Sequence, residues 1–305
     1  MKAFRIFLTN LISLPLALLL VLLGVLPFWV LYLFSHLLYF LLWHVAGYRK
    51  KVVLSNLEKA FPERGPEERK RIARAFYRHL SDVIIEIMGL LTAPKTTMRR
   101  RVSLDSESLE LMRRYYRERR SAILTLGHYG NWEWMGAGFN LAHPGQLVAG
   151  YRRLRNKLFD MLVYKARMRF YELLIPTKQL ARKIVSMNAE GQPAVFAFLA
   201  DQWPPPDTAY WITFMGRETP FFTGPEKLAR KLGHPVLFCS IRKQKRGHYL
   251  INVQVITEDP KSLPEQEITR RYAALLEKEI RREPRYWLWS HRRWKRERAE
   301  VRDEK

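Results

Sequence analysis

The stretch Leu124-Thr-Leu-Gly-His128-Tyr-Gly-Asn-Trp-Glu133 lies near the middle of this chain of 305 residues. The short apolar run from Ser121 to Leu126 predicts a buried strand, and residues 132–141 have helical composition, with Asn131 placed as the N-cap. A histidine and a carboxylate five residues apart cannot share one helix face, but a turn between them can bring them together. An imidazole oriented by a carboxylate is able to deprotonate a hydroxyl. His128 is therefore a candidate general base, with Glu133 as its orienting acid.

This spacing is weak as a signal on its own. The chain has 8 histidines and 29 acidic residues. About one match to a histidine followed five positions later by an acid is expected by chance, and a capping or core histidine is the commoner outcome. The surrounding motifs decide the interpretation of His128.

Further motifs occur in order along the chain, before and after residues 127–133. They are Asn56-Leu57 with Ala60-Phe61-Pro62, Tyr151-Arg152 followed by Asn156, Leu158 and Asp160, Asp201-Gln202, Phe214-x-Gly216 with Thr223-Gly224 and Leu228-Ala229, and Trp289-x-His291-Arg292-Arg293-Trp294-Lys295. This ordered series resembles the lipid A biosynthesis acyltransferases, the lauroyl/myristoyl transferases that act late in lipopolysaccharide assembly. Gly127 to Glu133 looks like the HxxxxE active-site motif of that family.

The resemblance implies a fold similar to that of the glycerol-3-phosphate acyltransferases, preceded by a membrane anchor. It also implies a catalytic domain on the cytoplasmic face of the bacterial inner membrane. The implied reaction moves a long-chain acyl group from acyl carrier protein to a hydroxyl of a lipid A precursor. No cofactor is expected, because the donor brings its own phosphopantetheine arm. A glycolipid, aminolipid or lysophospholipid remains an alternative acceptor.

The chain departs from the family pattern at several positions. Arg153 and Lys157 stand where prolines are frequent, Trp203 replaces an acidic residue, and three prolines follow at positions 204–206. These loops are expected to shape the acceptor or acyl pocket, so they bear on substrate identity.

Other polar residues complete the expected site. Arg152 is expected to stabilise an oxyanion or to bind a phosphate, because a guanidinium offers a fork of donors. Asp201 is expected to orient Arg152 or its neighbour, and both count as catalytic candidates. The substrate-binding or phosphate-binding candidates are Asn131, Tyr151, Gln202, His291, Arg292 and Arg293.

The closing motif also lies among aromatic residues. Cations interleaved with Tyr286, Trp287, Trp289 and Trp294 suit a lipid headgroup interface, with the indoles at the polar boundary. The same composition would suit stacking on single-stranded nucleic acid, but an anchored chain favours the membrane interpretation.

The amino-terminal segment carries no charged side chain over the 43 positions between Arg5 and Arg49. As a helix this run would extend about 64 Å, roughly twice the ~30 Å hydrocarbon core of a bilayer. A cleavable signal peptide is not expected, because the run is too long. Residues 1–48 are therefore predicted to be a membrane anchor and residues 49–305 a cytoplasmic domain. A single span followed by a docked helix and a hairpin bent near residues 24–27 remain alternatives.

The formal charge of +24 predicts an acidic partner. Nucleic acid is not expected, because no nucleic-acid-binding motif is present. Anionic headgroups and an acidic carrier protein are the expected partners, since both are attracted by basic surfaces. A tethered, non-enzymatic binder of acidic molecules is the rival class. No residues cluster with metal-ligand spacing, so no metal is expected. The single cysteine, Cys239, is expected in the core and cannot form an intrachain disulfide.

Helical and strand-like segments alternate through the second half of the chain. Helices are predicted over residues 67–91, 106–119, 132–142, 157–171, 179–189, 226–232 and 267–283. Strands are predicted over residues 121–126, 146–151, 172–175, 194–200, 235–241 and 249–256. This alternation predicts a three-layer α/β domain with a mostly parallel central sheet flanked by helices. His128 and Asp201 both follow predicted strands, so they are expected at the same sheet edge.

Overall fold

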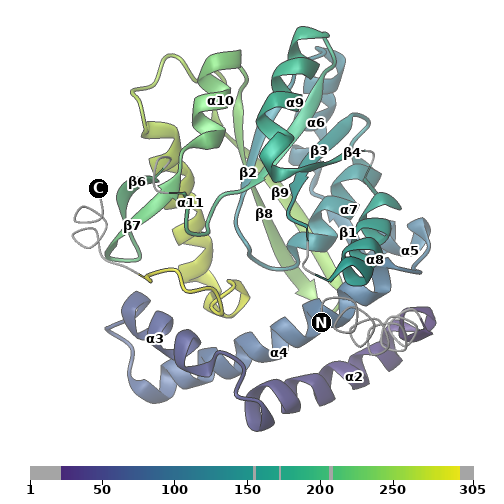
Figure 1. Cartoon of the computed structure of the whole chain (residues 1–305), viewed down its shortest axis with the longest axis vertical. Helices are drawn as coiled ribbons and strands as arrows, with labels where there is room; N and C mark the ends of the chain where they lie inside the picture. The colour runs from purple at the N-terminus through teal and green to yellow at the C-terminus, as the bar shows by residue number, and fades with distance from the viewer. Residues whose placement is uncertain (1–21, 154–155, 172, 206–208, 296–305) are drawn as a thin grey trace, which may run out of the picture.

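A sheet of seven strands runs through the computed structural model, which describes residues 22–153, 156–171, 173–205 and 209–295 (Figure 1). Its spatial order is β1-β9-β8-β2-β5-β3-β4. The strands are β1 (Val102–Leu104), β2 (Ala122–Leu126), β3 (Gln146–Tyr151), β4 (Leu173–Pro176), β5 (Ala194–Leu199), β8 (Val236–Lys245) and β9 (His248–Thr257). Strands β8, β2, β5, β3 and β4 run parallel, whereas β9 pairs antiparallel with β8. The predicted mostly parallel sheet is confirmed.

Helices cover both faces of this sheet (Figure 1). They are α2 (Phe28–Phe40), the π-helix η1 (Leu41–Val45), α3 (Lys50–Ala60), α4 (Pro66–Leu90), α5 (Lys95–Arg101), α6 (Ser106–Arg117), α7 (Trp132–Ala142), α8 (Lys157–Met168), α9 (Thr177–Ala189), α10 (Gly224–Leu232), α11 (Glu267–Arg282) and the short 3-10 helix η3 (Pro284–Tyr286). A separate hairpin of β6 (Ala209–Phe214) and β7 (Arg217–Phe222) lies beside α11.

Alternating side chains of the strands enter two separate cores. Ile123 of β2 packs in the core that includes α9, α10 and α11, whereas its neighbour Leu124 packs in the core that includes α6 and α7. All five residues of β2 are buried, as expected for a central strand covered on both faces. The three-layer α/β architecture is therefore confirmed.

Strand order places the candidate site residues next to each other. Strand β5 pairs directly with β2, and Leu126 is in register with Leu199. His128 and Asp201 each lie two residues beyond these paired positions. The expectation that both lie at one sheet edge is confirmed.

An apolar helix lies at the amino-terminal end of the described residues. The stretch Phe28–Val45 is long and apolar enough to cross a membrane, which is consistent with the predicted anchor. The chain leaves the helical conformation at Leu26 and Pro27, near the bend that the hairpin alternative requires. Positions 1–21, which include the first part of the uncharged run (6–21), lie outside the described residues.

Candidate active site

A tight turn carries His128 from the end of β2 to the start of α7. At Gly127 a Cβ atom would approach Leu276 Cδ1 to 2.6 Å, so no larger residue fits without a shift of that side chain. Gly130 has a φ of +62°, and a Cβ there would lie 2.9 Å from the carbonyl oxygen of Ile241. Glycine is therefore required at both positions, because neighbouring atoms lie too close for a Cβ. At Gly130 the left-handed backbone also favours glycine.

Asn131 caps helix α7, as the sequence predicted. Its Oδ1 accepts a hydrogen bond from the backbone nitrogen of Trp134 at 2.9 Å. Its Nδ2 donates to Oε2 of Glu86 at 2.6 Å, and the side chain is completely buried. Because both polar atoms are occupied beneath the turn, the prediction that Asn131 binds substrate is wrong.

Asp201 is the carboxylate that orients His128. Nδ1 of His128 lies 2.6 Å from Oδ1 of Asp201, and the backbone nitrogen of His128 donates to Oδ2 at 2.8 Å. Nε1 of Trp287 donates to the same Oδ2 at 2.9 Å. Burial alone would raise the pKa of Asp201, but the charge of His128 and these donors outweigh it and lower that pKa to about 2. Asp201 is thus held as an ionised partner of the imidazole.

Glu133 does not contact His128 in this way, so the predicted role as its orienting acid is wrong. The Glu133 carboxylate forms a bidentate ion pair with Arg167 of α8, with oxygen–nitrogen distances of 2.6 and 2.9 Å. As the second residue of α7, Glu133 reaches toward α8 rather than back over the turn. The expectation that Asp201 orients Arg152 is also wrong, because its two oxygens serve His128 and Trp287.

The other ring nitrogen of His128 is within hydrogen-bond distance of the Gln202 amide, which a substrate hydroxyl would have to displace. Nε2 lies 3.2 Å from Nε2 of Gln202, and the imidazole side chain is 16% exposed. Trp132 packs edge-on against the ring, with centroids 5.3 Å apart. When Nδ1 carries the ring proton and donates it in a hydrogen bond to Asp201, Nε2 has a lone pair. A general base needs such a lone pair to take a proton.

A cavity of about 590 Å³ has His128 and Gln202 in its wall. Several predicted site residues line it together, namely His128, Glu133, Tyr151, Arg152 and Gln202. Arg152 is exposed and Tyr151 is half-buried at the end of β3. The rest of the wall is mostly apolar and includes Leu126, Met135, Leu147, Ala149, Leu180, Ala197, Phe198 and Leu228. Such a cavity suits a long apolar ligand with a polar reacting end.

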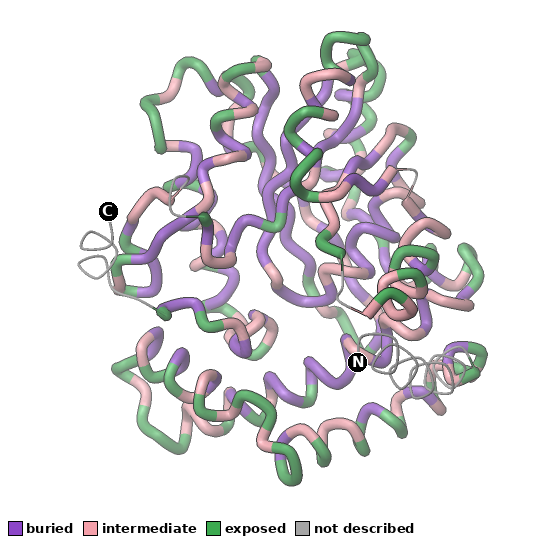
Figure 2. Tube along the Cα trace, viewed as in Figure 1, coloured by how far each residue is buried: buried purple, intermediate pink, exposed green. Residues whose placement is uncertain are grey.

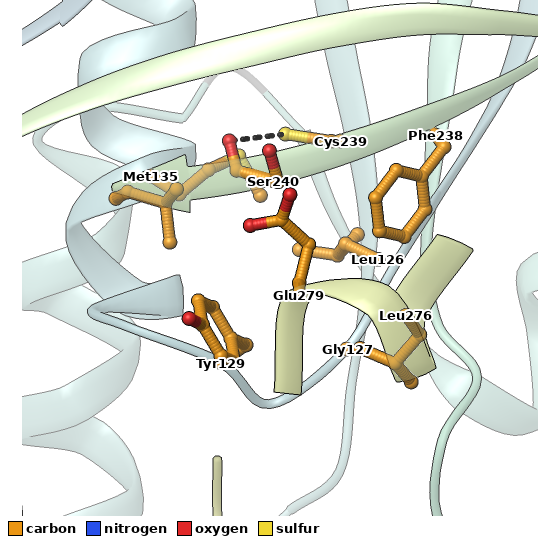
Figure 3. A pocket seen from close by; sticks show the side chains of 10 residues that line it. Leu126, Gly127, Tyr129, Met135, Phe238, Cys239, Ser240, Leu276 and Glu279 are labelled. Atoms are coloured by element: carbon orange, nitrogen blue, oxygen red, sulfur yellow. Dashed lines mark hydrogen bonds between the residues drawn. The ribbon is translucent and has the colours of Figure 1, made fainter. Parts of the chain in front are cut away.

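A second, much smaller cavity lies behind the catalytic turn (Figure 3). Its volume is about 10 Å³, and its wall includes Tyr129, Met135, Ser240 and Glu279. A space of this size holds at most one water molecule. It is therefore too small for a substrate, unlike the cavity of about 590 Å³.

The C-terminal segment is hydrogen-bonded to the turn that carries His128. The backbone nitrogen of Gly130 donates to the carbonyl of Tyr286, and that of Leu288 donates to the carbonyl of His128, both at 3.0 Å. Nδ2 of Asn56 donates to the carbonyl of Trp289 at 2.8 Å and to that of His291 at 2.7 Å. The early Asn56 motif and the closing motif are therefore one structural unit.

The closing motif does not form the predicted headgroup interface. Trp287, Trp289 and Trp294 are all buried, and the tightest, Trp289, is fully enclosed. Arg293 is 1% exposed, donates from Nη2 to the carbonyl of Pro220 at 2.6 Å, and burial lowers its pKa to about 10. Arg293 does not line the cavity that contains His128, and its role in binding phosphate stays a prediction.

The two remaining candidates of this motif differ from Arg293. His291 is partly buried, and burial lowers its pKa to about 4, so it is neutral near pH 7. Arg292 is exposed. Neither lines the cavity that contains His128. Their role in binding stays a prediction.

Two residues of the site were missed by sequence reasoning. Arg167 lies 34 residues from Glu133 and outside every quoted motif, so no local signal pointed to it. Trp287 belongs to the aromatic segment before the closing motif, but its contact with Asp201 depends on the tertiary fold.

Within the described residues no group of three or more His, Cys, Asp or Glu side chains could hold a metal ion. Cys239 is buried, as expected.

Known proteins similar to this chain belong to one bacterial family. The family model for bacterial lipid A biosynthesis acyltransferases matches residues 2–296. The chain is 28% identical over 262 residues to the lipid A biosynthesis palmitoleoyltransferase of Escherichia coli K12, covering 81% of this chain and 79% of that protein. It is 26% identical over 253 residues to the lauroyltransferase of the same strain, with the same coverage of both chains.

A third relative is the lipid A biosynthesis acyltransferase of Haemophilus influenzae. It is 25% identical over 279 residues, which cover 87% of this chain and 81% of the relative. The family match extends over nearly the whole sequence and includes every residue of the cavity described above. The chain therefore belongs to the bacterial lipid A biosynthesis acyltransferase family and is an acyltransferase.

Proposed function

We propose that this enzyme transfers a long-chain fatty acyl group from acyl carrier protein to a hydroxyl of a lipid A precursor, late in lipopolysaccharide assembly. The observation that carries the proposal is that His128, whose Nδ1 is held by Asp201, lines a mostly apolar cavity. Family membership supports a lipid A-type acceptor.

The proposed reaction needs one base and one site for developing negative charge. Nε2 of His128 takes the proton of the acceptor hydroxyl while its oxygen attacks the thioester carbonyl carbon. The carbonyl oxygen gains charge as the new C–O bond forms. The C–S bond then breaks, the carbonyl is restored as an ester, and the proton passes from His128 to the departing thiolate. Asp201 stabilises the imidazolium that exists between the two proton transfers.

Cations at the cavity wall provide the complementary charge. Arg152, Arg167 and Lys227 all line the cavity. Arg167 is neutralised by Glu133, so Arg152 and Lys227 are the better candidates for phosphate groups or the oxyanion. The apolar wall would hold the acyl chain, since each buried methylene contributes about 0.8 kcal/mol.

The proposed donor follows from charge as well as from the family. A chain of +24 offers an extended basic surface, which an acidic carrier protein can engage at several points. An acyl-CoA presents the same thioester but only a small nucleotide head group. Added salt should therefore lower kcat/KM more steeply with acyl carrier protein than with acyl-CoA. Equal efficiencies with parallel salt dependence would contradict a carrier-protein donor.

The acceptor is tested in cells. Deleting the gene in its native host should produce lipid A species that lack one acyl chain, detected by mass spectrometry of extracted lipids. Wild-type enzyme should restore the missing chain, and His128→Ala should not. Unchanged lipid A together with an altered glycolipid, aminolipid or lysophospholipid would contradict the proposed acceptor and favour the same chemistry on another lipid. The bacterial inner membrane, with the catalytic domain facing the cytoplasm, is the proposed location.

A further inference from the structure

Helix α2 and its continuation η1 have one exposed, apolar face. Large exposed apolar side chains recur every four residues along it, and this spacing makes each a neighbour of the next on the helix surface. They are Trp29 (70% exposed), Leu33 (61%), Leu37 (55%), Leu41 (42%) and Val45 (67%). We call these five residues the outer stripe. In Figure 2 the helix lies at the edge of the molecule, with exposed residues along its outer side.

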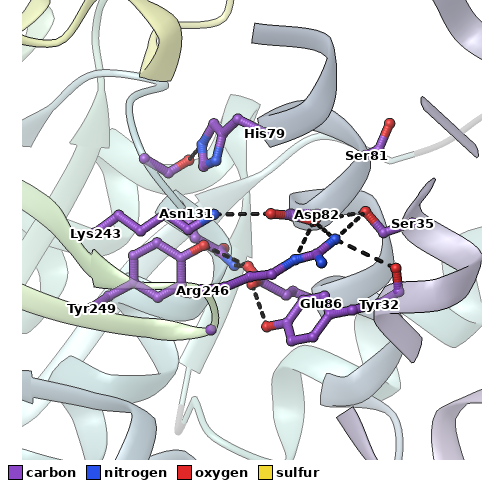
Figure 4. A network of polar contacts seen from close by, with 12 residues as sticks. Tyr32, Ser35, His79, Ser81, Asp82, Glu86, Asn131, Lys243, Arg246 and Tyr249 are labelled. Atoms are coloured by element: carbon purple, nitrogen blue, oxygen red, sulfur yellow. Dashed lines mark hydrogen bonds and ion pairs between the residues drawn. The ribbon is translucent and has the colours of Figure 1, made fainter. Parts of the chain in front are cut away.

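The opposite face of α2 is bound to charged groups of the catalytic domain. Oγ of Ser35 donates to Oδ1 of Asp82 in α4 at 2.7 Å, and Ser35 is 1% exposed. Lys243 and Arg246, from the β8–β9 hairpin, lie 2.9 and 2.6 Å from the same carboxylate. Figure 4 shows this network, with Tyr32 also donating to Oε1 of Glu86 at 2.8 Å. The inner face of α2 is therefore bound to the protein, in part through polar and charged groups.

Helix α4 lies beside α2 (Figure 1), and exposed arginines of α4 contact aromatic rings at the C-terminal end of α2 and in η1. Arg71, Arg74 and Arg78 are all exposed and lie on one side of α4. The guanidinium of Arg78 lies 5.2 Å from the ring of Tyr39, and that of Arg74 lies 5.9 Å from the ring of Trp43. We call these three residues the basic ridge.

These contacts conflict with a bilayer-spanning α2. Its length and apolar composition fit a span, but a spanning helix would place its neighbour α4 at the same depth in the hydrocarbon. The basic ridge and the network around Asp82 would then lie inside the bilayer, where ionised side chains are strongly disfavoured. A helix with lipid on one side and charged protein on the other belongs at the membrane surface.

We propose that α2 and η1 lie in the plane of the membrane surface, with the outer stripe in the acyl-chain region and the basic ridge at anionic headgroups. This inference rests on the membrane location in the proposed function. An anionic membrane surface is the partner that fits, because its negative charge complements the arginines of the basic ridge. Basic residues beside an apolar stripe are typical of interfacial helices. It concerns residues 28–45 only.

The arrangement also places the active site near the lipid surface. The catalytic turn rests on α4, because Nε2 of His79 lies 3.1 Å from the carbonyl oxygen of Gly130 and Glu86 accepts from Asn131. One helix therefore separates the turn that carries His128 from the membrane-bound helix. A lipid acceptor would reach the cavity from the surface without leaving the membrane region completely.

Depth measurements on spin labels test this inference. Single cysteines are introduced at each of the five outer-stripe positions in a Cys239→Ala background that retains activity. The labelled protein is bound to phosphatidylethanolamine/phosphatidylglycerol vesicles, and collision with oxygen and with a water-soluble nickel complex reports the depth. All five labels should lie at a similar shallow depth. A label at Tyr116→Cys on α6, 50% exposed, should remain in water as the control.

The alternatives give different depth profiles. A spanning helix would give a steady change of about 1.5 Å per residue from position 29 to position 45, passing through the bilayer centre. That result would overturn the in-plane arrangement and leave membrane attachment intact. Labels shielded from both reagents would show that protein covers the stripe, which also overturns it. Five labels in water on vesicle-bound protein would overturn the inference, and failure of the protein to bind vesicles would contradict the proposed membrane location.

Discussion

Nδ1 of His128 lies 2.6 Å from Oδ1 of Asp201, although 73 residues separate them in the sequence. The contact exists because β2 and β5 are hydrogen-bonded neighbours whose last residues are in register. Asp201 is 2% exposed and also accepts a hydrogen bond from the buried indole of Trp287. The proposed base is thus oriented across two strands and supported by the C-terminal segment.

The ionisation of Asp201 should appear in the pH dependence of stability. Its pKa of about 2 in the folded protein lies below the usual 3.8, so its ionised form stabilises the fold above about pH 4. That contribution, about 2 kcal/mol, should be lost as the pH falls through 2. Urea unfolding should show a larger difference between wild type and Asp201→Asn at about pH 6 than at about pH 2.5. A difference that does not change with pH would contradict this ionisation.

The ion pair of Glu133 and Arg167 should couple energetically. Glu133→Gln and Arg167→Gln each leave one largely buried charge without its partner, so each should lower the free energy of unfolding. The double variant should lose less than the sum, by about 1 to 3 kcal/mol. Glu133→Gln combined with Asp201→Asn is the control and should be additive within about 0.5 kcal/mol. Stronger coupling of Glu133 to Asp201 than to Arg167 would restore Glu133 as a partner of the dyad.

Trp287 should position His128 and Asp201, the catalytic dyad of the proposed mechanism, rather than only fill the core. Trp287→Phe removes the indole donor to Asp201, a hydrogen bond to a charged group worth about 1.5 kcal/mol or more. We expect kcat to fall about tenfold, with an upfield shift of the proton NMR signal of His128 Nδ1–H. Trp289→Phe is the matched control, because that indole is equally buried but donates to the carbonyl of Pro284. Equal effects of the two variants on the NMR signal would assign Trp287 to packing alone.

The basic ridge should contribute to membrane binding. Arg74→Gln with Arg78→Gln should weaken binding to phosphatidylglycerol vesicles, because each cation near an anionic surface contributes about 1 kcal/mol. Added salt should reduce the difference from wild type. The control, Arg113→Gln with Arg117→Gln on α6, removes the same charge from two exposed positions far from α2 (Figure 1). If the two double variants bind equally well, net charge rather than this ridge attracts the membrane.

Local features of the sequence predicted most of the fold. The apolar run 121–126 and the cap Asn131 correctly predicted strand β2, the turn and the start of α7. Alternating segments correctly predicted a three-layer domain, because each strand and helix has its own periodicity. Helices α3 and α5, strand β1 and the β6–β7 hairpin were not predicted.

The pairing of the polar side chains could not be predicted in the same way. Which acid reaches His128 depends on β5 lying beside β2, and sequence spacing instead favoured Glu133. The Arg167 contact depends on the packing of α8 against α7, which leaves no local pattern. Interleaved aromatics and cations in residues 286–295 suggested an exposed interface, yet the indoles and Arg293 fill the core behind the turn.

Turnover of purified variants with acylated acyl carrier protein and a lipid A precursor tests most directly whether His128, oriented by Asp201, is the general base. Both His128→Ala and Asp201→Asn should lower kcat by about 10² to 10⁴, the range expected for losing a positioned base. The double variant should be no slower than the worse single variant, because the two residues act as one unit. Wild-type kcat in His128→Ala, or an Asp201→Asn enzyme that retains full activity, would contradict the mechanism.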